Sequence, residues 1–366
     1  MDNNLNENKR PAENDPAFVS EEQKRRFITK WLIKRTREAY KPRWRRLHGT
    51  ERLIYKWFLY NAVMLNTERF TITVQTNAAQ LSKIYDDMCM DNPALFFLDG
   101  FSYCVSDGLA EITMKYDLSF DETVNNAAVM EKALRRLKTA CEGKSFLEKE
   151  LIVHNCLTSE VTYDLEADIP KYDSHSIFLH GRAVCAGMSE SASVMFGYIG
   201  IDSYTVVGDY TPAKDAPENP RHEWNMVRIG DCFYHFDVTF DNSLSRRRGT
   251  QMYTYFNLTD EQIAKDHRFS AALGRSGTER VDYYTLTGSM FDDKESLREF
   301  IAERLRRKES LIRFRMSYDI NKDEADKIED IIADVRDREA PGTAFSYCSY
   351  FDSNSFAIMI GQPLKD

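Results

Sequence analysis

The segment from Gly181 to Ser191 reads GRAVCAGMSES and places one cysteine between a β-prone Ala-Val pair and a run of small, helix-compatible residues. The pattern predicts a helix that begins near Cys185 and ends at Gly200. A thiol in a first helical turn lies beside unpaired backbone N–H groups and the positive end of the helix dipole, which favour the thiolate. Cys185 is therefore a candidate nucleophile, although an isolated cysteine more often packs as a small hydrophobic side chain.

A histidine and an aspartate with the spacing of a β-hairpin follow this segment. The sequence RHEWNMVRIGDCFYHFDVTFD alternates as two strands, joined by a Gly-Asp pair at 230 and 231 that suits a tight type II′ turn. With Ile229 opposite Cys232, His222 and Asp237 become diagonal neighbours on one face, within reach of a hydrogen bond. The same register sets two further pairs opposite each other, Trp224 with Asp237 and His222 with Thr239.

Cys185, His222 and Asp237 together supply a nucleophile, a general base and a carboxylate that orients the base. This arrangement activates a thiol for acyl transfer. Because sequence spacing alone brings the histidine to the aspartate, the remaining requirement is that the cysteine helix packs beside the hairpin.

Three other candidates fit their motifs less well than these residues fit a triad. The sequence CEGKS at 141–145 is similar to a phosphate-binding loop, but Lys138 stands where the earlier glycine belongs. The segment from Asp319 is similar to a calcium loop, yet Glu324 replaces the turn glycine and Asp330 the closing bidentate residue. His235 shares a face with Asp237, but the spacing fits the triad better than zinc. We expect no metal and no cofactor.

The elements around these residues repeat one order. Strand-like, helical and paired strand-like runs occupy 70–76, 78–89, 94–106 and 109–117, and the same order recurs over 311–361. Phe-Ser-Tyr-Cys enters the hairpin of both units, at 101–104 and 345–348. We expect two related β-α-β-β units, and we predict that they pack beside one another as an accessory platform.

Size and composition fit a globular protein with one or two domains, since the 366 residues are 42% hydrophobic and 29% charged. No run approaches the ~18 apolar residues of a membrane span, and the first residues lack the apolar stretch of a signal peptide. A cytoplasmic location is expected. The seven cysteines form no CxxC pair, which argues against a disulfide scaffold and a zinc ribbon.

Charge is concentrated in one basic segment. Residues 24–46 hold eleven Lys or Arg and a single acid, Glu38, whereas the whole chain has a net charge of -9. The acidic remainder argues against a nucleic-acid-binding protein, although the segment alone could bind an anionic partner. We favour an amphipathic helix that docks on its own domain through Phe27, Ile28, Trp31 and Leu32.

Three segments, GRAVCAGMSESASVMFGYIGI, HEWNMVRIGDCFYHFDVTFD and YTYFNLTDEQIAKDH, resemble those of bacterial transglutaminase-like proteins. The resemblance runs from about residue 146 to 267. It implies an α+β, papain-like core in which a helix carrying Cys185 packs on an antiparallel sheet carrying His222 and Asp237. It also implies that these three residues form the catalytic triad.

The chain departs from the resemblance at four positions, Ala186, Met188, Glu223 and Phe240. The first two leave the substrate contacts open, and Glu223, opposite His222 across the strand, is expected at the solvent or rim. Tyr163 matches an aromatic residue near the cysteine in the family. We therefore assign a substrate or oxyanion region to Tyr163, Ala186 and Trp224.

The expected organisation is a disordered tail (1–20), a basic helical segment (21–65), a β-α-β-β unit (66–120), a core (121–285), and a helix with the second unit (286–366). The expected function is acyl transfer or hydrolysis on a peptide or amide through a thioester on Cys185. Water as acceptor gives a peptidase or amidase, and an amine gives a transglutaminase. The alternative is a non-catalytic module that binds a peptide or partner. Loop 209–220 is expected to border the cleft.

Overall fold

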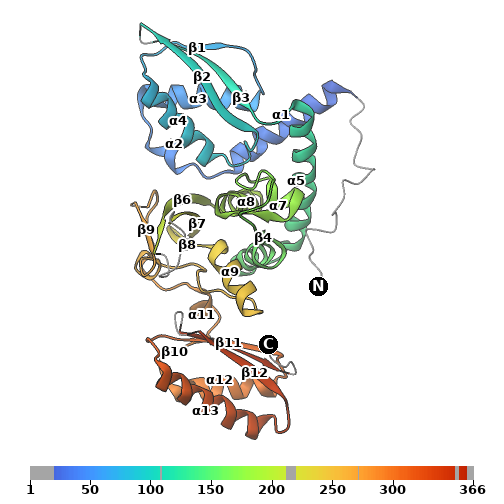
Figure 1. The fold of residues 1–366 in the computed structure, drawn as a ribbon, viewed down its shortest axis with the longest axis vertical. Coiled ribbons are helices and arrows are strands. Elements are labelled where there is room, and N and C mark those ends of the chain that lie inside the picture. The colour runs from blue at the N-terminus through green and yellow to red at the C-terminus, as the bar shows by residue number, and fades with distance from the viewer. Residues whose placement is uncertain (1–19, 108, 212–219, 271, 351–353, 361–366) are drawn as a thin grey trace.

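The computed structural model describes residues 20–107, 109–211, 220–270, 272–350 and 354–360. Residues 1–19 of the expected tail and residues 212–219 of the predicted cleft loop lie outside these ranges. Three regions follow one another along the long axis of the molecule: an N-terminal unit, a central region and a C-terminal unit (Figure 1). The fold mixes helices and antiparallel sheets, so the expected α+β class is confirmed.

The N-terminal region sets four helices beside a small antiparallel sheet of order β1-β3-β2. Its elements are α1 (Glu21–Glu38), α2 (Pro42–Arg46), α3 (Gly49–Val63), β1 (Phe70–Ile72), α4 (Ala78–Asp91), β2 (Leu98–Ser106) and β3 (Leu109–Tyr116). Residues 94–97 were expected to begin a strand, but they form buried turns closed by hydrogen bonds such as Leu98 N to Leu95 O at 3.2 Å. The apolar residues 94–97 are therefore buried without pairing in a β-sheet.

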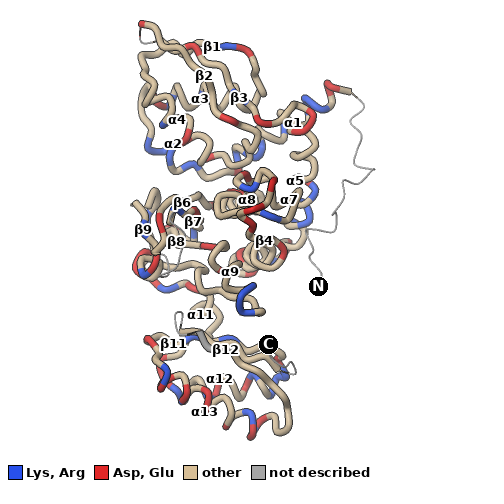
Figure 2. The backbone as a smooth tube through the Cα atoms, viewed as in Figure 1, with Lys and Arg blue, Asp and Glu red and all other residues tan. Residues whose placement is uncertain are grey.

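The basic segment docks on its own chain. Ile28, Trp31 and Leu32 are buried on one face of α1, as the helical spacing predicts. Lys24 pairs with Asp121 at 2.7 Å on a helix of the central region, and Arg46 donates to the carbonyl of Ala272 at 3.0 Å. Figure 2 shows these basic stretches beside the central region. Some basic side chains of this segment therefore bind groups of the same chain.

The central region packs helices around one antiparallel sheet of order β8-β7-β6-β9. Its elements are α5 (Phe120–Ala140), α6 (Phe146–Asn155), the π-helical turn η1 (Cys156–Glu160), β4 (Thr162–Tyr163), α7 (Ser176–His180), β5 (Arg182–Ala183), α8 (Cys185–Tyr198), β6 (Ser203–Tyr210), β7 (Arg221–Ile229), β8 (Cys232–Phe236), α9 (Val238–Arg248), α10 (Asp260–Ile263) and β9 (His267–Phe269). Helix α8 packs against β7 and β6. The expected arrangement of a cysteine-bearing helix on an antiparallel sheet is present.

The hairpin register is confirmed over most of its length and differs at its end. Ile229 pairs with Cys232 and Asn225 with Phe236, and Gly230 has a φ of +60° in the turn. Strand β8 ends at Phe236, because Asp237 caps α9 by accepting from backbone N–H groups. The expected pairs of Trp224 with Asp237 and of His222 with Thr239 are therefore wrong.

The C-terminal unit repeats the strand order of the N-terminal one. A short helix, α11 (Tyr283–Leu286), leads into β10 (Met290–Phe291), α12 (Lys294–Arg306), β11 (Leu311–Met316), α13 (Lys322–Glu339), β12 (Phe345–Tyr350) and β13 (Ser355–Ile360). The sheet order is β10-β11-β13-β12, so the first strand of the β-α-β-β unit pairs with its last, as in β1-β3-β2. Both Phe-Ser-Tyr-Cys segments lie on the second strand of their unit.

The predicted platform is wrong, because the two units lie at opposite ends of the molecule with the central region between them (Figure 1). Each unit covers its own sheet: Phe58 of α3 and Tyr85 of α4 pack on Phe101 of β2, and α12 and α13 share a separate core with β11 and β13. Since both sheet faces in question are already covered, mutual docking is not required. None of the helices in the described ranges is long and apolar enough to cross a bilayer.

Candidate active site

Cys185 is the first residue of α8 and is half-buried. The first hydrogen bond within the helix runs from Met188 N to Val184 O at 3.0 Å, so the N–H groups of the three residues before Met188 have no partner inside the helix. The thiol therefore lies next to free backbone donors at the positive end of the helix dipole. A nucleophile placed there has an anion-stabilising environment built from the main chain.

Gly187 allows the chain before the helix to approach it closely. A Cβ at this position would collide with the backbone carbonyl of Lys171. The same carbonyl accepts from Val184 N at 3.0 Å, just before the cysteine. The small residue thus lets the 171–173 segment fix the start of α8.

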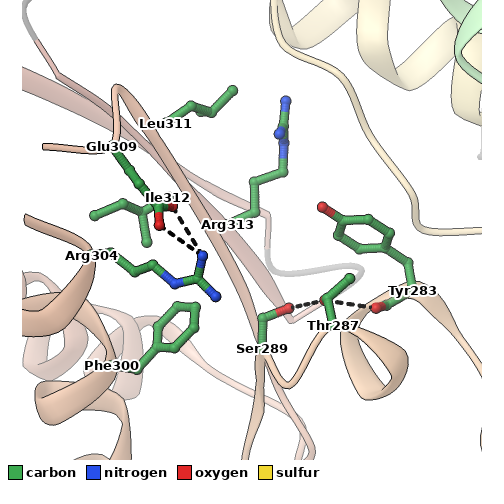
Figure 3. A pocket seen from close by; sticks show the side chains of 9 residues that line it. All are labelled: Tyr283, Thr287, Ser289, Phe300, Arg304, Glu309, Leu311, Ile312 and Arg313. Carbon is green, nitrogen blue, oxygen red and sulfur yellow. Dashed lines mark hydrogen bonds and ion pairs between the residues drawn. The ribbon is translucent and has the colours of Figure 1, made fainter. Parts of the chain in front are cut away.

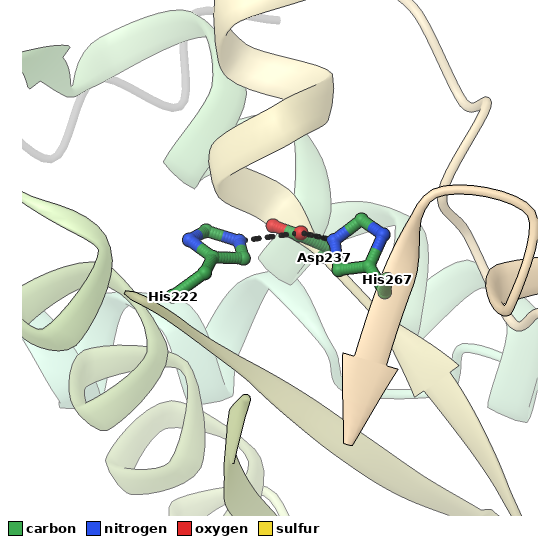
Figure 4. A group of neighbouring side chains, drawn as sticks. All are labelled: His222, Asp237 and His267. Carbon is green, nitrogen blue, oxygen red and sulfur yellow. Dashed lines mark hydrogen bonds and ion pairs between the residues drawn. The ribbon is translucent and has the colours of Figure 1, made fainter. Parts of the chain in front are cut away.

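His222 and Asp237 meet through a short hydrogen bond. The Nε2 atom of His222 lies 2.7 Å from Oδ2 of Asp237, and both side chains are buried. The other ring nitrogen, Nδ1, points away from the aspartate (Figure 4). Cys185 lies close enough to His222 to contribute to the raised pKa of its imidazole, so the structure brings all three residues together.

Asp237 is held at every hydrogen-bonding position. Its Oδ1 accepts from the backbone N–H groups of Thr239 at 3.0 Å and Phe240 at 3.1 Å. Its Oδ2 accepts from His222 at 2.7 Å and His267 at 3.1 Å. Burial alone would raise the pKa of Asp237, but the charge and hydrogen bonds of the two histidines lower it below its ordinary value. The carboxylate is therefore ionised and fixed in orientation.

His222 is enclosed by aromatic rings and charged by its partners. Its ring stacks on Trp224 at 5.7 Å between centroids and contacts Phe240 at 4.9 Å. Burial would lower the pKa of His222, but the charge and hydrogen bond of Asp237, with a smaller contribution from Cys185, raise it to about 10. The imidazole thus carries a proton at neutral pH.

The expected substrate and oxyanion residues separate into two groups. Tyr163 and Ala186 are half-buried near the thiol, and burial together with Cys185 raises the pKa of Tyr163 to about 12. Trp224 is 1% exposed, and its indole N–H donates to Nδ1 of His235 at 2.9 Å. The prediction that Trp224 contacts substrate is therefore wrong. Its side-chain N–H already donates to His235, and its ring stacks on the ring of His222.

Three of the four departures from the family pattern also have structural roles here. Met188 is fully buried under Thr239 and is not available to a substrate, whereas Phe240 is half-buried and packs on His222. Glu223 was expected at the solvent or rim. Its carboxylate accepts from Ser189 of α8 at 2.7 Å and burial raises its pKa. Glu223 is partly exposed, so it lies at the rim as expected, and its carboxylate also ties β7 to α8.

His267 is a site residue that the sequence analysis missed. It opens β9, which pairs with β6, and its Nε2 reaches the same Asp237 oxygen as His222 (Figure 4). Gly208 of β6 lies opposite both His222 and Phe269, and a Cβ there would collide with the Arg268 carbonyl and the Trp224 ring. The available signal was the histidine that ends YTYFNLTDEQIAKDH, which has no spacing relationship to the hairpin.

His222, Asp237 and His267 form a group with ligand atoms within 4.8 Å of one another, which is close enough for the three side chains to be candidate metal ligands. Zinc binds neutral ring nitrogens at about 2.0–2.1 Å, with the ligands arranged around the ion. Here one carboxylate oxygen lies between two Nε2 atoms at hydrogen-bonding distances of 2.7 and 3.1 Å. This geometry fits two N–H donors on one acceptor, and the residues do not fit a metal site.

His235 does not join this group. It accepts from Trp224 at Nδ1, and its Nε2 lies 3.0 Å from Oδ1 of Asp260. An indole N–H can only donate, so His235 is the neutral tautomer with its proton on Nε2. Burial lowers the pKa of His235, which agrees with this assignment.

A cavity of about 370 Å³ lies away from these residues, beside the C-terminal unit (Figure 3). In it Arg304 makes a two-point ion pair with Glu309, at 2.8 and 3.1 Å, and the hydroxyls of Thr287 and Ser289 bond each other at 2.7 Å. The lining residues are Tyr283, Thr287, Ser289, Phe300, Arg304, Glu309, Leu311, Ile312 and Arg313. None of the candidate catalytic residues lines it.

Comparisons with known proteins support the assignment of the central region. Residues 132–238 match the model of the Transglutaminase-like superfamily, and this segment holds Cys185, His222 and Asp237. No curated protein matches the chain.

Similar solved structures include a candidate cysteine protease from Cytophaga hutchinsonii, with 11% identity, a TM-score of 0.26, and coverage of 38% of this chain and 61% of that one. A TGase has 17% identity, a TM-score of 0.28, and coverage of 47% and 50%. A candidate protease from Parabacteroides distasonis has 12% identity, a TM-score of 0.21, and coverage of 38% and 35%. The chain thus spans less than two thirds of each, and at these TM-scores nothing further is inferred from them. On the family match, the central region of this chain carries a domain of the transglutaminase-like superfamily.

Proposed function

We propose that the protein catalyses cysteine-dependent acyl transfer or hydrolysis on a peptide or amide substrate. The observation that carries this proposal is the hydrogen bond between Asp237 and His222 beside the thiol of Cys185, which is half-buried at the start of a helix. A charged carboxylate, a proton-bearing imidazole and a thiol in this order are the parts of a nucleophilic triad.

The first half-reaction follows from this order. In the resting site His222 already holds the proton that Cys185 has given up, and the thiolate sulfur attacks the substrate carbonyl carbon. The carbonyl oxygen becomes an oxyanion that faces the free N–H groups of Cys185 and Ala186 at the helix start. The C–N bond then breaks as His222 transfers its proton to the leaving amine, and a thioester on Cys185 remains.

The second half-reaction returns the enzyme to its starting state. Neutral His222 removes a proton from water or from an acceptor amine, which attacks the thioester carbonyl. The C–S bond breaks, and the acyl group leaves as an acid or as a new amide. Water makes the protein a peptidase or amidase, and an amine makes it a transglutaminase.

Alkylation combined with intact mass tests this proposal. At neutral pH, iodoacetamide should modify Cys185 faster than Cys104, even though the Cys104 side chain is exposed and Cys185 is only half-buried. An amide-based covalent probe should add one acyl group to the wild-type protein and none to Cys185→Ala. Cys232→Ala, at another half-buried thiol, is the matched control and should label normally.

Two results would contradict the proposal. One is a labelling rate that follows exposure alone, with Cys104 first, which would favour the alternative of a non-catalytic peptide-binding module. The other is an acyl adduct that persists in Cys185→Ala. Competition between water and a primary amine for the adduct then separates hydrolysis from transamidation.

A further inference from the structure

The ring of His267 lies between two carboxylates. Its Nε2 is 3.1 Å from Oδ2 of Asp237, and its Nδ1 is 2.6 Å from Oδ1 of Asp266. The side chain is fully buried, with Trp224 and Phe240 at ring-centroid distances of 5.0 and 4.8 Å. No ring nitrogen is therefore left for water.

Both carboxylates are occupied as acceptors on both oxygens. Asp237 accepts two backbone N–H groups on Oδ1 and two histidines on Oδ2. Asp266 accepts from His267 on Oδ1 and from the hydroxyl of Tyr255 on Oδ2. An ionised carboxylate only accepts hydrogen bonds, so each nitrogen of His267 must carry a proton. A neutral imidazole would direct a lone pair at one of the two anions.

We propose that His267 is a buried imidazolium that positions Asp237 and weakens its hold on the proton of His222. His267 keeps Oδ2 of Asp237 oriented toward His222. Because Asp237 Oδ2 accepts from both rings, its negative charge stabilises the proton of His222 less than it would alone. The two rings are 5.6 Å apart between centroids, so a positive charge on His267 also repels one on His222. The consequence is a general base that releases its proton more readily than a histidine with an unshared aspartate.

The other charged and titratable groups around His222 and His267 do not reverse the expected effect, in which the charge on His267 lowers the pKa of His222. His235 is neutral, as its contact with Trp224 requires. Burial raises the pKa of Tyr255, and of Tyr163 to about 12, so both phenols stay uncharged near neutral pH. The groups that lie nearest the two rings are Asp237, Asp266, Cys185, Glu223, His235, Tyr210 and Tyr255.

This inference deepens the proposed function and rests on it for its catalytic meaning, so its test uses a measurement that needs no activity. The full chain, labelled with ¹⁵N at histidine and carrying Cys185→Ala, is titrated by NMR. Removal of the thiol takes away its contribution to the raised pKa of His222, so the remaining shift is caused by Asp237 and, as proposed, by the charge on His267. Single His→Gln variants assign the resonances.

Two substitutions on this background separate charge from packing. His267→Gln keeps a neutral donor near Asp237 and removes the positive charge. Asp266→Asn leaves the imidazole in place and removes the anion that requires its second proton; Asp266 is 36% exposed, so this change is compatible with folding even where His267→Gln is not.

The expected results are a doubly protonated His267 at pH 7, a rise of roughly one pH unit in the pKa of His222 in His267→Gln, and a smaller rise in Asp266→Asn. A single neutral tautomer of His267 at pH 7 overturns the proposal. So does a charged His267 whose loss leaves the pKa of His222 unchanged or lower. The proposed function fails separately, if Cys185 forms no acyl adduct.

Discussion

Asn225 of β7 donates to the backbone carbonyl of Ser189 on α8 at 2.8 Å, and it also reaches the Ser193 hydroxyl at 3.0 Å. These bonds fasten the strand that carries His222 to the helix that carries Cys185. The side chain is fully buried, so water does not replace the contacts if they are lost.

We predict that Asn225→Ala destabilises the protein and also slows acylation of Cys185. Loss of the two donors leaves the Ser189 carbonyl without this partner, which costs about 1–3 kcal/mol. Chemical denaturation measures the stability change, and probe labelling measures the rate. Asn61→Ala, at a buried asparagine of the N-terminal unit that donates to Trp57 at 2.8 Å, should lower stability without a matching loss of rate. Equal losses of acylation rate in both variants would show that the hydrogen bonds between Asn225 and α8 do not position Cys185 and His222 for the reaction.

The alkylation of Cys185 should depend on His222. In the wild type the imidazole accepts the thiol proton, so alkylation should remain fast as the pH falls toward the acid range. In His222→Ala the dependence on pH should become that of an unassisted thiol, with the rate at pH 6 reduced at least tenfold. Cys104 in the same sample is the internal control. Identical pH profiles for Cys185 in the two proteins would refute the pairing.

Protein stability should fall as the pH rises from about 6.5 to 10. The pKa of His222 is raised to about 10 in the folded state, and an unfolded histidine titrates near 6.5. The folded protein therefore binds the extra proton in this window, and the stabilisation is fully present below about pH 6.5 and lost through pH 10. One such group contributes a slope of at most about 1.4 kcal/mol per pH unit.

His222→Gln should remove this part of the slope, as measured by urea denaturation at several pH values. His180→Gln, at an exposed helix end, is the control and should keep the wild-type slope. A wild-type slope that survives in His222→Gln would mean that the raised pKa belongs to another group.

Chelation should leave acylation of Cys185 unchanged. The proposed reaction uses the thiol, and the three residues that could ligate a metal are engaged in hydrogen bonds to one another. Dialysis against a strong chelator, followed by probe labelling and metal analysis, checks this. A loss of labelling that added zinc restores would replace the hydrogen-bonded interpretation with a metal centre.

The hairpin and the start of α8 could be predicted because their signals are local. Alternation of apolar residues, a Gly-Asp turn and the run of small residues after Cys185 each depend on neighbours in the chain, and a two-residue turn fixes the register. The end of β8 could not be predicted in the same way. Asp237 is a strand residue by pattern, but its carboxylate caps α9, and the capping bonds end the pairing.

The position of Glu223 was decided by packing rather than by pattern. In a sheet with one covered face, a residue next to His222 in the chain would point to solvent. Here α8 supplies Ser189 as a hydrogen-bond donor on that side, so the carboxylate of the partly exposed Glu223 is held against the helix. A strand pattern states only that two faces alternate, and it does not state what covers each face.

By itself the sequence determined the α+β class, the helix that begins at Cys185, the hairpin register, and the three residues that the structure brings together. These follow from periodicity, turn chemistry and the resemblance of short segments. Only the tertiary structure decided that His267 reaches Asp237, that the Trp224 ring stacks on His222, and that the two β-α-β-β units lie at opposite ends of the folded molecule. The reason is that strand β9 joins the sheet through β6, a partner more than fifty positions earlier, and each unit buries its sheet on its own helices. Contacts between distant segments depend on which surfaces remain uncovered after the local elements form, and no local pattern records that outcome.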